Sequence, residues 1–218
     1  MNKFPQDIFT EPQNIDIHTL NNLGPLGKMA GIWKGDRGLD LKPKAEGPKK
    51  QAYIENIELQ PIDPQTNGPQ LLYGLRYHVF ITKPDQIKTY HEQVGYWLWD
   101  PENEMVIHTI AIPRGLIAMA TGHVKKTATQ FELIAKQDNP TAGISSAPFL
   151  EYAFRTIEYR IQVSINTDGT WSYEQDTVLM INGQTTPFHH TDKNLLIKIG
   201  EPTPNPLSLN ATGHTLIT

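Results

Sequence analysis

The feature that most constrains the fold is a two-residue periodicity of apolar side chains, which recurs from about Ile54 onward. It is clearest between Ile157 and Ile165, where Ile, Tyr and Val alternate with Glu, Arg, Gln and Ser. Successive side chains of a β-strand point to opposite faces, so this pattern predicts a strand with one buried and one solvated face. The helical content we expect is small, a short helix or turn within residues 21–29.

About ten strands are predicted in this way. They are 52–59, 71–81, 90–99, 105–112, 116–121, 130–135, 156–165, 170–181 and 195–199, with a further strand around Trp33. Short turns rich in Asp, Asn, Pro and Gly separate them and leave no room for the crossovers of a parallel sheet. The fold class is therefore all-β, and an antiparallel up-and-down β-barrel is the simplest closure because it leaves no exposed edge.

The two ends of the chain differ from this pattern. Residues 1–25 and 201–218 have too little apolar content to pack alone, and we expect an N-terminal arm and a C-terminal tail. Between them, residues 26–200 form one ligand-binding β-barrel domain. The connection 136–150, which contains two Pro and one Gly, is a candidate lid.

Composition removes several classes of function. The absence of Cys excludes disulfides, thiolate metal sites and a catalytic thiol. A net charge of −4 without a long basic run argues against a nucleic-acid partner. Neither a signal-peptide-like start nor a run of about 18 apolar residues occurs, so we expect a cytoplasmic protein with no membrane partner.

Four segments in a fixed order carry a family resemblance. They are Gly31–Gly38 (GIWKGDRG), His91–Trp97 (HEQVGYW), Ile112–Gly115 (IPRG) and Phe188–Leu196 (FHHTDKNLL). Together they resemble the nitrobindin-like haem-binding β-barrel family, which is fatty-acid-binding-protein-like, and more closely a bacterial branch with Gly-Asp-x-Gly after the tryptophan. The resemblance covers about residues 26–199. It implies a ten-stranded barrel of the lipocalin or calycin-like type that holds haem b through a histidine near the last strand.

The resemblance also implies site residues. It places the haem ligand in the pair His189 and His190, and its Phe-x-His-Thr-Asp pattern points to His190 as the metal ligand. Strand parity does not choose between the two, because we expect Thr191 and Asp192 to interrupt the last strand. From its neighbours alone, His190 can also be explained as a histidine at the barrel mouth, hydrogen-bonded to Thr191 or Asp192.

A second pocket histidine corresponds to His91 by the same resemblance. Whether its side chain faces inward is open, because Glu92 beside it must then face outward, and the reverse arrangement buries the carboxylate instead. Arg114 lies between Pro113 and Gly115 in an apolar region, and its planar guanidinium suits a carboxylate or a haem propionate. The alternative is an exposed turn arginine.

Three further residues complete the predicted cofactor-binding set. Trp33 is expected to form the floor of the barrel, and Met119 and Met180 are candidates for apolar pocket lining, although both also suit a plain core. The remaining histidines show no metal-ligand spacing; they are His18, His78, His108, His123 and His214.

Two functions from different classes follow. The first is an intracellular barrel that binds a hydrophobic ligand with acidic groups, with haem b as the first candidate and with nitric oxide or peroxynitrite chemistry if the family's activity extends to this chain. The second is a metal-free carrier of a fatty acid or another small carboxylate, anchored by Arg114. A hydrolase or isomerase built on His91 and Glu92 ranks last, because adjacent strand residues face apart. A homodimer is a possible assembly.

Overall fold

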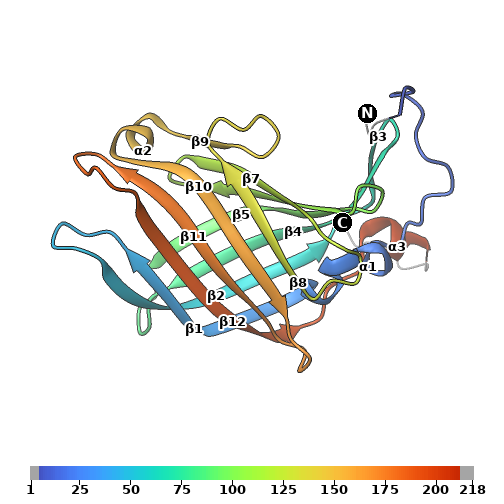
Figure 1. The fold of residues 1–218 in the computed structure, drawn as a ribbon. Coiled ribbons are helices and arrows are strands. Elements are labelled where there is room, and N and C mark those ends of the chain that lie inside the picture. The colour runs from blue at the N-terminus through green and yellow to red at the C-terminus, as the bar shows by residue number, and fades with distance from the viewer. Residues whose placement is uncertain (1–4, 212–218) are drawn as a thin grey trace.

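The structure is a computed structural model that describes residues 5–211 (Figure 1). One of the eight histidines, His214, lies outside this range. The helical elements are α1 (Thr19–Asn22), the 3-10 helix η1 (Gly24–Met29), α2 (Pro148–Ala153) and α3 (Pro206–Ala211). The strands are β1 (Gly31–Lys42), β2 (Lys49–Pro61), β3 (Gln65–Asn67), β4 (Gln70–Thr82), β5 (Thr89–Asp100), β6 (Met105–Ile112), β7 (Leu116–His123), β8 (Gln130–Lys136), β9 (Ile144–Ser146), β10 (Phe154–Ile165), β11 (Trp171–Ile181) and β12 (Phe188–Gly200).

Ten of these strands form a closed antiparallel barrel. Their order is β2-β1-β12-β11-β10-β8-β7-β6-β5-β4, and the pairing of β2 with β4 closes the ring. The short strands β3 and β9 pair with β4 and β7 beside the ring. The predicted all-β fold class and the ten-stranded barrel are therefore confirmed.

The largest difference from the predicted elements concerns the last strand. β12 begins at Phe188 rather than Leu195, and it pairs with β11 without interruption through Thr191 and Asp192. The expected break at these two residues was wrong. Ladder hydrogen bonds from β11 on one side and β1 on the other hold this polar stretch extended, although its own residues carry no apolar alternation.

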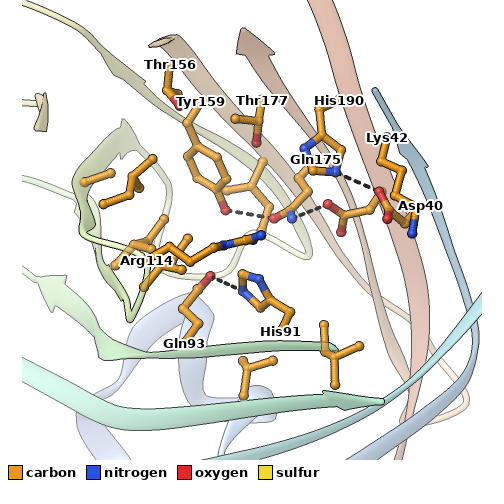
Figure 2. A pocket seen from close by; sticks show the side chains of 18 of the residues that line it. Asp40, Lys42, His91, Gln93, Arg114, Thr156, Tyr159, Gln175, Thr177 and His190 are labelled. Carbon is orange, nitrogen blue, oxygen red and sulfur yellow. Dashed lines mark hydrogen bonds and ion pairs between the residues drawn. The ribbon is translucent and has the colours of Figure 1, made fainter. Parts of the chain in front are cut away.

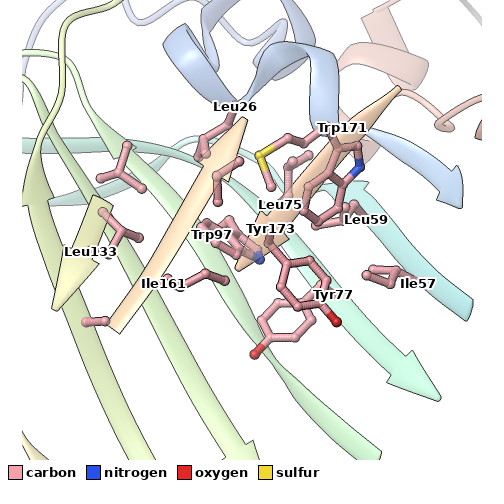
Figure 3. Close-up of a cluster of buried hydrophobic side chains, with 14 of the residues drawn as sticks. Leu26, Ile57, Leu59, Leu75, Tyr77, Trp97, Leu133, Ile161, Trp171 and Tyr173 are labelled. Atoms are coloured by element: carbon pink, nitrogen blue, oxygen red, sulfur yellow. The ribbon is translucent and has the colours of Figure 1, made fainter. Parts of the chain in front are cut away.

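The mouth of the cavity lies at the end of the barrel that carries α2 and β9, because Leu150 and Ile144 line the cavity. The core residues of η1 close the other end, where α1 also lies (Figure 1). The two N-terminal helices occupy the segment where a short helix or turn was expected, and Leu26 of η1 is fully buried against the core. Gly24 has a φ of +54°, and a Cβ there would overlap the indole of Trp99, so glycine is required where η1 packs on the floor. Figure 3 shows the apolar side chains that fill this end.

The described parts of the two terminal arms are joined to each other by hydrogen bonds. The side chain of Asn205 accepts from the backbone N–H of Thr19 at 3.2 Å and donates to the backbone oxygen of Ile17 at 2.9 Å. It also donates to Asp63, which accepts from the N–H of Leu207 as well. A nearly fully buried asparagine thus fixes both arms at the closed end of the barrel.

A β-bulge in β1 changes which of its residues face the interior. The pairing of β1 with β2 shifts register between Gly35 and Gly38, and the burial pattern changes phase there. Trp33 is buried before the bulge and Asp40 after it, while Leu39 is exposed. The bulge within the Gly-Asp-x-Gly motif therefore directs the side chain of Asp40 into the barrel interior.

The connection 136–150 is part of the barrel wall in this structure. β8 pairs with β10 along its whole length, but with β7 only through Thr121 and Ile134. Where β8 and β7 diverge, β9 pairs with Leu116–Ala118 of β7 and fills the gap. Backbone bonds from Ala147 to Gly115 continue this attachment toward the mouth.

Candidate functional site

The barrel encloses a cavity of about 460 Å³ that reaches the mouth. This volume lies in the range of about 300–1,000 Å³ that small-molecule sites occupy. Apolar and aromatic side chains make up most of its wall, and the charged groups come mainly from the strand ends at the mouth. The polar and charged lining residues are Asp40, Lys42, Lys44, Tyr53, Glu55, Tyr77, Tyr90, His91, Gln93, His108, Arg114, Thr156, Tyr159, Tyr173, Gln175, Thr177, His190 and Asp192.

His190 projects into this cavity from β12 and is paired with Asp40 of β1. Its Nε2 lies 2.7 Å from a carboxylate oxygen of Asp40 (Figure 2). The other oxygen of Asp40 accepts the hydroxyl of Tyr90, and Lys42 donates to the same hydroxyl at 2.7 Å. Burial acts to raise the pKa of Asp40, but the bonds from His190 and Tyr90 hold it below its ordinary value. Asp40 is thus an ionised partner for the imidazole.

His91 enters the same space from β5, and Glu92 points to the outer surface. The His91 ring lies 3.4 Å from Oε1 of Gln93, while Glu92 pairs with His78 outside the barrel. Burial lowers the pKa of His91, and the nearby charge of Arg114 lowers it further. A neutral imidazole is therefore favoured here, and the two adjacent residues cannot act together on one substrate.

Arg114 reaches over the cavity from the turn between β6 and β7 (Figure 2). No carboxylate among residues 5–211 forms an ion pair with it, although it belongs to the cavity lining. A guanidinium at the mouth of an apolar cavity is suited to an acidic group of a ligand.

Two buried carboxyl groups, Glu55 and Asp192, line the cavity together with His190. Glu55 of β2 accepts hydrogen bonds from Tyr173 at 2.8 Å and from Asn194 at 2.9 Å. Burial raises the pKa of Glu55 to about 7, although both hydrogen bonds act to lower it. Both protonation states of this carboxyl are therefore accessible near neutral pH.

Asp192 continues this network from β12. It accepts hydrogen bonds from Gln175 and, at 3.3 Å, from the hydroxyl of Tyr53. Tyr53 and Tyr173 share a hydrogen bond of 2.9 Å, which links Asp192 to the Glu55 cluster. Burial raises the pKa of Asp192 to about 6. The wall beside His190 thus holds two proton-binding groups joined by tyrosine hydroxyls.

The structure brings three of the predicted site residues into the cavity wall and leaves four outside it. His190, His91 and Arg114 line the cavity. His189 does not, because the uninterrupted β12 turns it outward, where its Nδ1 pairs with Asp176 at 2.6 Å. Of the two histidines, only His190 faces the interior.

The predicted apolar lining residues lie elsewhere. Met119 and Met180 are not in the cavity wall, because their neighbours Ala118 and Leu179 are, and adjacent strand residues face apart. Trp33 lies below the cavity at the closed end, where its Nε1 donates to the backbone oxygen of Met29 at 2.7 Å. Its ring meets the edge of Trp171, which does line the cavity.

Asp40, Glu55 and Asp192 are site residues that were not predicted from the sequence. Glu55 carried a signal, because it stands in the same strand phase as Ile57 and Leu59, which are buried. Asp40 and Asp192 carried none, since their inward orientation depends on the bulge in β1 and on the extension of β12.

Two further findings bear on the kind of ligand. Within residues 5–211, no cluster of three or more His, Asp or Glu is arranged to hold a metal ion. No described helix is both long and apolar enough to cross a membrane.

The family of this chain follows from its similarity to known proteins. Residues 22–198 match the family described as "THAP4-like, heme-binding beta-barrel domain". The crystal structure of Rv2717c from M. tuberculosis is similar in fold, with a TM-score of 0.55 and 22% sequence identity over 83% of this chain and 98% of that chain. No match was found among curated proteins. Because the family match spans the barrel from η1 to β12, the chain belongs to the family of THAP4-like haem-binding β-barrel domains.

Proposed function

We propose that this chain binds haem b in the barrel cavity, with a ring nitrogen of His190 as the protein ligand to iron. The observation that carries the proposal is that His190 faces a ligand-sized cavity while its neighbour His189 does not. Neutral imidazole is the usual protein ligand of haem iron, and the aromatic and aliphatic wall suits a porphyrin. Membership of a haem-binding family supports the same ligand.

The surroundings of His190 fit this role. Its Nε2 is held by Asp40, and Nδ1 has no hydrogen-bond partner among residues 5–211. A carboxylate on one ring nitrogen of a metal-binding histidine fixes the tautomer and makes the other nitrogen a stronger donor. Asp40 is in this position, so it would orient the ring and strengthen iron binding.

The mouth supplies groups for the acidic part of the ligand. Arg114, Lys42 and Lys44 belong to the cavity lining, and Arg114 has no ion-pair partner within the described chain. Propionates placed among these cations keep contact with water while the porphyrin is buried. His91, which stays neutral, faces the same space and would hydrogen-bond a small molecule held opposite His190.

When bound, haem would supply nitric oxide binding and peroxynitrite isomerisation to nitrate at its iron. The chain's own residues hold the ligand and exclude bulk water from it. The activity is tested by following the decay of peroxynitrite with the haem-loaded protein and with a loaded His91→Phe variant. A decay rate no faster than that of free hemin would refute the isomerase activity while leaving haem binding intact.

The matched pair His190→Ala and His189→Ala tests the ligand assignment. Both changes remove an imidazole from β12, but only the first removes one from the cavity. After titration with hemin, we expect the wild type and His189→Ala to give the same Soret band and His190→Ala to lose it. Equal spectra for the two variants would show that the assignment is wrong.

A second function is metal-free transport of a fatty acid or other small carboxylate. It is favoured by Arg114, which has no ion-pair partner within residues 5–211 and lies at a largely apolar cavity wall. Native mass spectrometry of the protein as purified separates the two, since the adduct is either haem-sized or fatty-acid-sized. Arg114→Gln should release a fatty acid, whereas it should only weaken haem that His190 still holds. A haem-sized adduct rules the metal-free carrier out, and a fatty-acid-sized adduct that persists in Arg114→Gln rules out Arg114 as its anchor.

A further inference from the structure

His108 of β6 is a buried histidine for which the described chain provides no hydrogen-bond partner. Its exposed fraction is 2%, and neither Nδ1 nor Nε2 is bonded. A neutral imidazole has one donor and one acceptor, and leaving both unpaired in a protein interior costs folding free energy. Buried polar groups in native proteins are nearly always satisfied, so the missing partner requires an explanation.

The neighbours of His108 do not supply that partner. Its ring stacks on Trp97 at 3.8 Å with an interplanar angle of 13°, and the rings of Tyr77 and Tyr159 are 5.2 and 6.4 Å away. The hydroxyl of Tyr77 already donates to the backbone oxygen of Thr109 at 3.1 Å and accepts from Gln93. The hydroxyl of Tyr159 donates to Gln175 at 3.0 Å.

The ring of His108 also borders the cavity. His108 is one of the residues that line it, and it lies four residues before Ile112 on β6. At ~3.3 Å per residue it is about 13 Å deeper along the strand than the turn that carries Arg114. His108 therefore stands at the inner end of the cavity, and His190 and Arg114 stand near its mouth.

The inner end favours an uncharged group. Burial lowers the pKa of His108 to about 3, so the ring is neutral at physiological pH. Glu55 lines the same cavity and becomes an anion as its pKa of about 7 is passed. A second carboxylate placed here would meet a neutral imidazole and a buried acid, whereas the mouth offers Lys42, Lys44 and Arg114.

We propose that His108 is a specificity-determining residue that hydrogen-bonds a neutral hydroxyl or carbonyl group at the buried end of the ligand. An iron porphyrin with a polar, uncharged substituent on its buried edge is then bound more tightly than haem b, whose substituents on that edge are vinyl groups. The inference rests on the proposed function in one respect, because it takes an iron porphyrin with its propionates at the mouth as the occupant.

Two iron porphyrins serve as matched probes. Iron protoporphyrin IX carries two vinyl groups on the edge opposite its propionates, and iron haematoporphyrin IX carries 1-hydroxyethyl groups in the same positions. The wild type should bind the hydroxyethyl compound about fivefold more tightly, the ratio that corresponds to about 1 kcal/mol for one neutral hydrogen bond. Affinities are measured by Soret titration of the full chain.

Two variants locate the preference. His108→Phe keeps an aromatic ring on Trp97 but removes both polar atoms, and the two probes should then bind within about twofold of each other. His108→Gln keeps a donor and an acceptor and should retain the preference for the hydroxyethyl compound. A role limited to packing would change both affinities together and leave their ratio unchanged.

The outcomes separate this inference from the proposed function. Equal affinities of the wild type for the two probes, with a Soret band that still depends on His190, overturn the role of His108 alone; water then fills the inner end. A preference that survives in His108→Phe overturns it as well. If neither probe gives a Soret band with the wild type, the haem function fails and this inference fails with it.

Discussion

Replacement of Glu55 by glutamine tests the buried proton-binding network directly. Glu55 is 2% exposed, and its Oε2 accepts both the Tyr173 hydroxyl and the Asn194 amide. The amide oxygen of glutamine is isosteric with that carboxylate oxygen and accepts the same two bonds. The substitution therefore removes the titration with little change in packing, and its effect on stability is expected to depend on pH.

The sign follows from the raised pKa of Glu55. Between about 4.5, the value of the unfolded chain, and about 7 in the folded protein, the folded state holds the proton more tightly. The wild type is therefore stabilised by this group below pH 4.5 and loses that stabilisation as pH rises through 7. This rise in pKa corresponds to about 3 kcal/mol in total, most of which falls between pH 5 and 8.

The assay is urea unfolding of the ligand-free protein at pH 5 and pH 8, followed by tryptophan fluorescence. The difference in unfolding free energy, Glu55→Gln minus wild type, should rise by about 2–3 kcal/mol from pH 5 to 8. At an m-value of about 2 kcal/mol/M this is a relative midpoint shift of about 1 M urea. Titrations of groups that do not interact with Glu55 occur in both proteins, so they cancel in this difference.

Glu174→Gln is the matched control, because it removes an exposed carboxylate from β11 on the outer face of the same barrel. Its difference from the wild type should stay within about 0.5 kcal/mol at both pH values. A Glu55→Gln difference that is independent of pH, or that falls as pH rises, would refute the raised pKa and the sign derived from it.

The other predictions concern packing and are read from thermal or urea unfolding. Gly38→Ala should cost about 1–3 kcal/mol, because the new Cβ would overlap the ring of Tyr53, whereas Gly27→Ala, with no atom within 4 Å, should be close to neutral; equal effects would argue against the close contact at the bulge. Leu133→Ala, at a fully buried position, should cost about 3 kcal/mol, and Ile117→Ala on the exposed outer face of β7 less than about 1 kcal/mol. Similar losses at these two positions would contradict the assigned orientations of β7 and β8.

The barrel was predictable because the alternation of apolar and polar residues within a strand indicates which side chains face the interior. In β10 the residues Tyr159, Ile161, Val163 and Ile165 are buried as the alternation indicated. The same pattern was misleading at the strand's beginning, where the register shift between Thr156 and Glu158 brings Thr156 inward in place of Ile157. In a regular strand, the alternation indicates which residues face inward. A bulge exchanges the inward and outward positions, and the pattern of apolar residues does not reveal it.

The site was less predictable, for a related reason. His190 and Asp192 lie in a polar stretch whose phase is set by pairing with Thr177 and Gln175 of β11, which are themselves polar. Local sequence gives no periodicity there, and the family resemblance alone favoured His190 over His189. Glu55 and His108 did occupy apolar phases in their strands, so a polar residue at a buried position was the signal available for both.

The bulge in β1 connects these observations. Gly35 precedes the bulge and packs against the side chain of Asn194, and Gly38 follows it and packs against the ring of Tyr53. A Cβ at either glycine would overlap that neighbour. Asn194 binds Glu55 and Tyr53 binds Asp192, so the two glycines make room for the residues that hold both buried acids. The same shift turns Asp40 inward to meet His190. One four-residue motif on the first strand thus organises the polar wall on which the last strand presents its histidine.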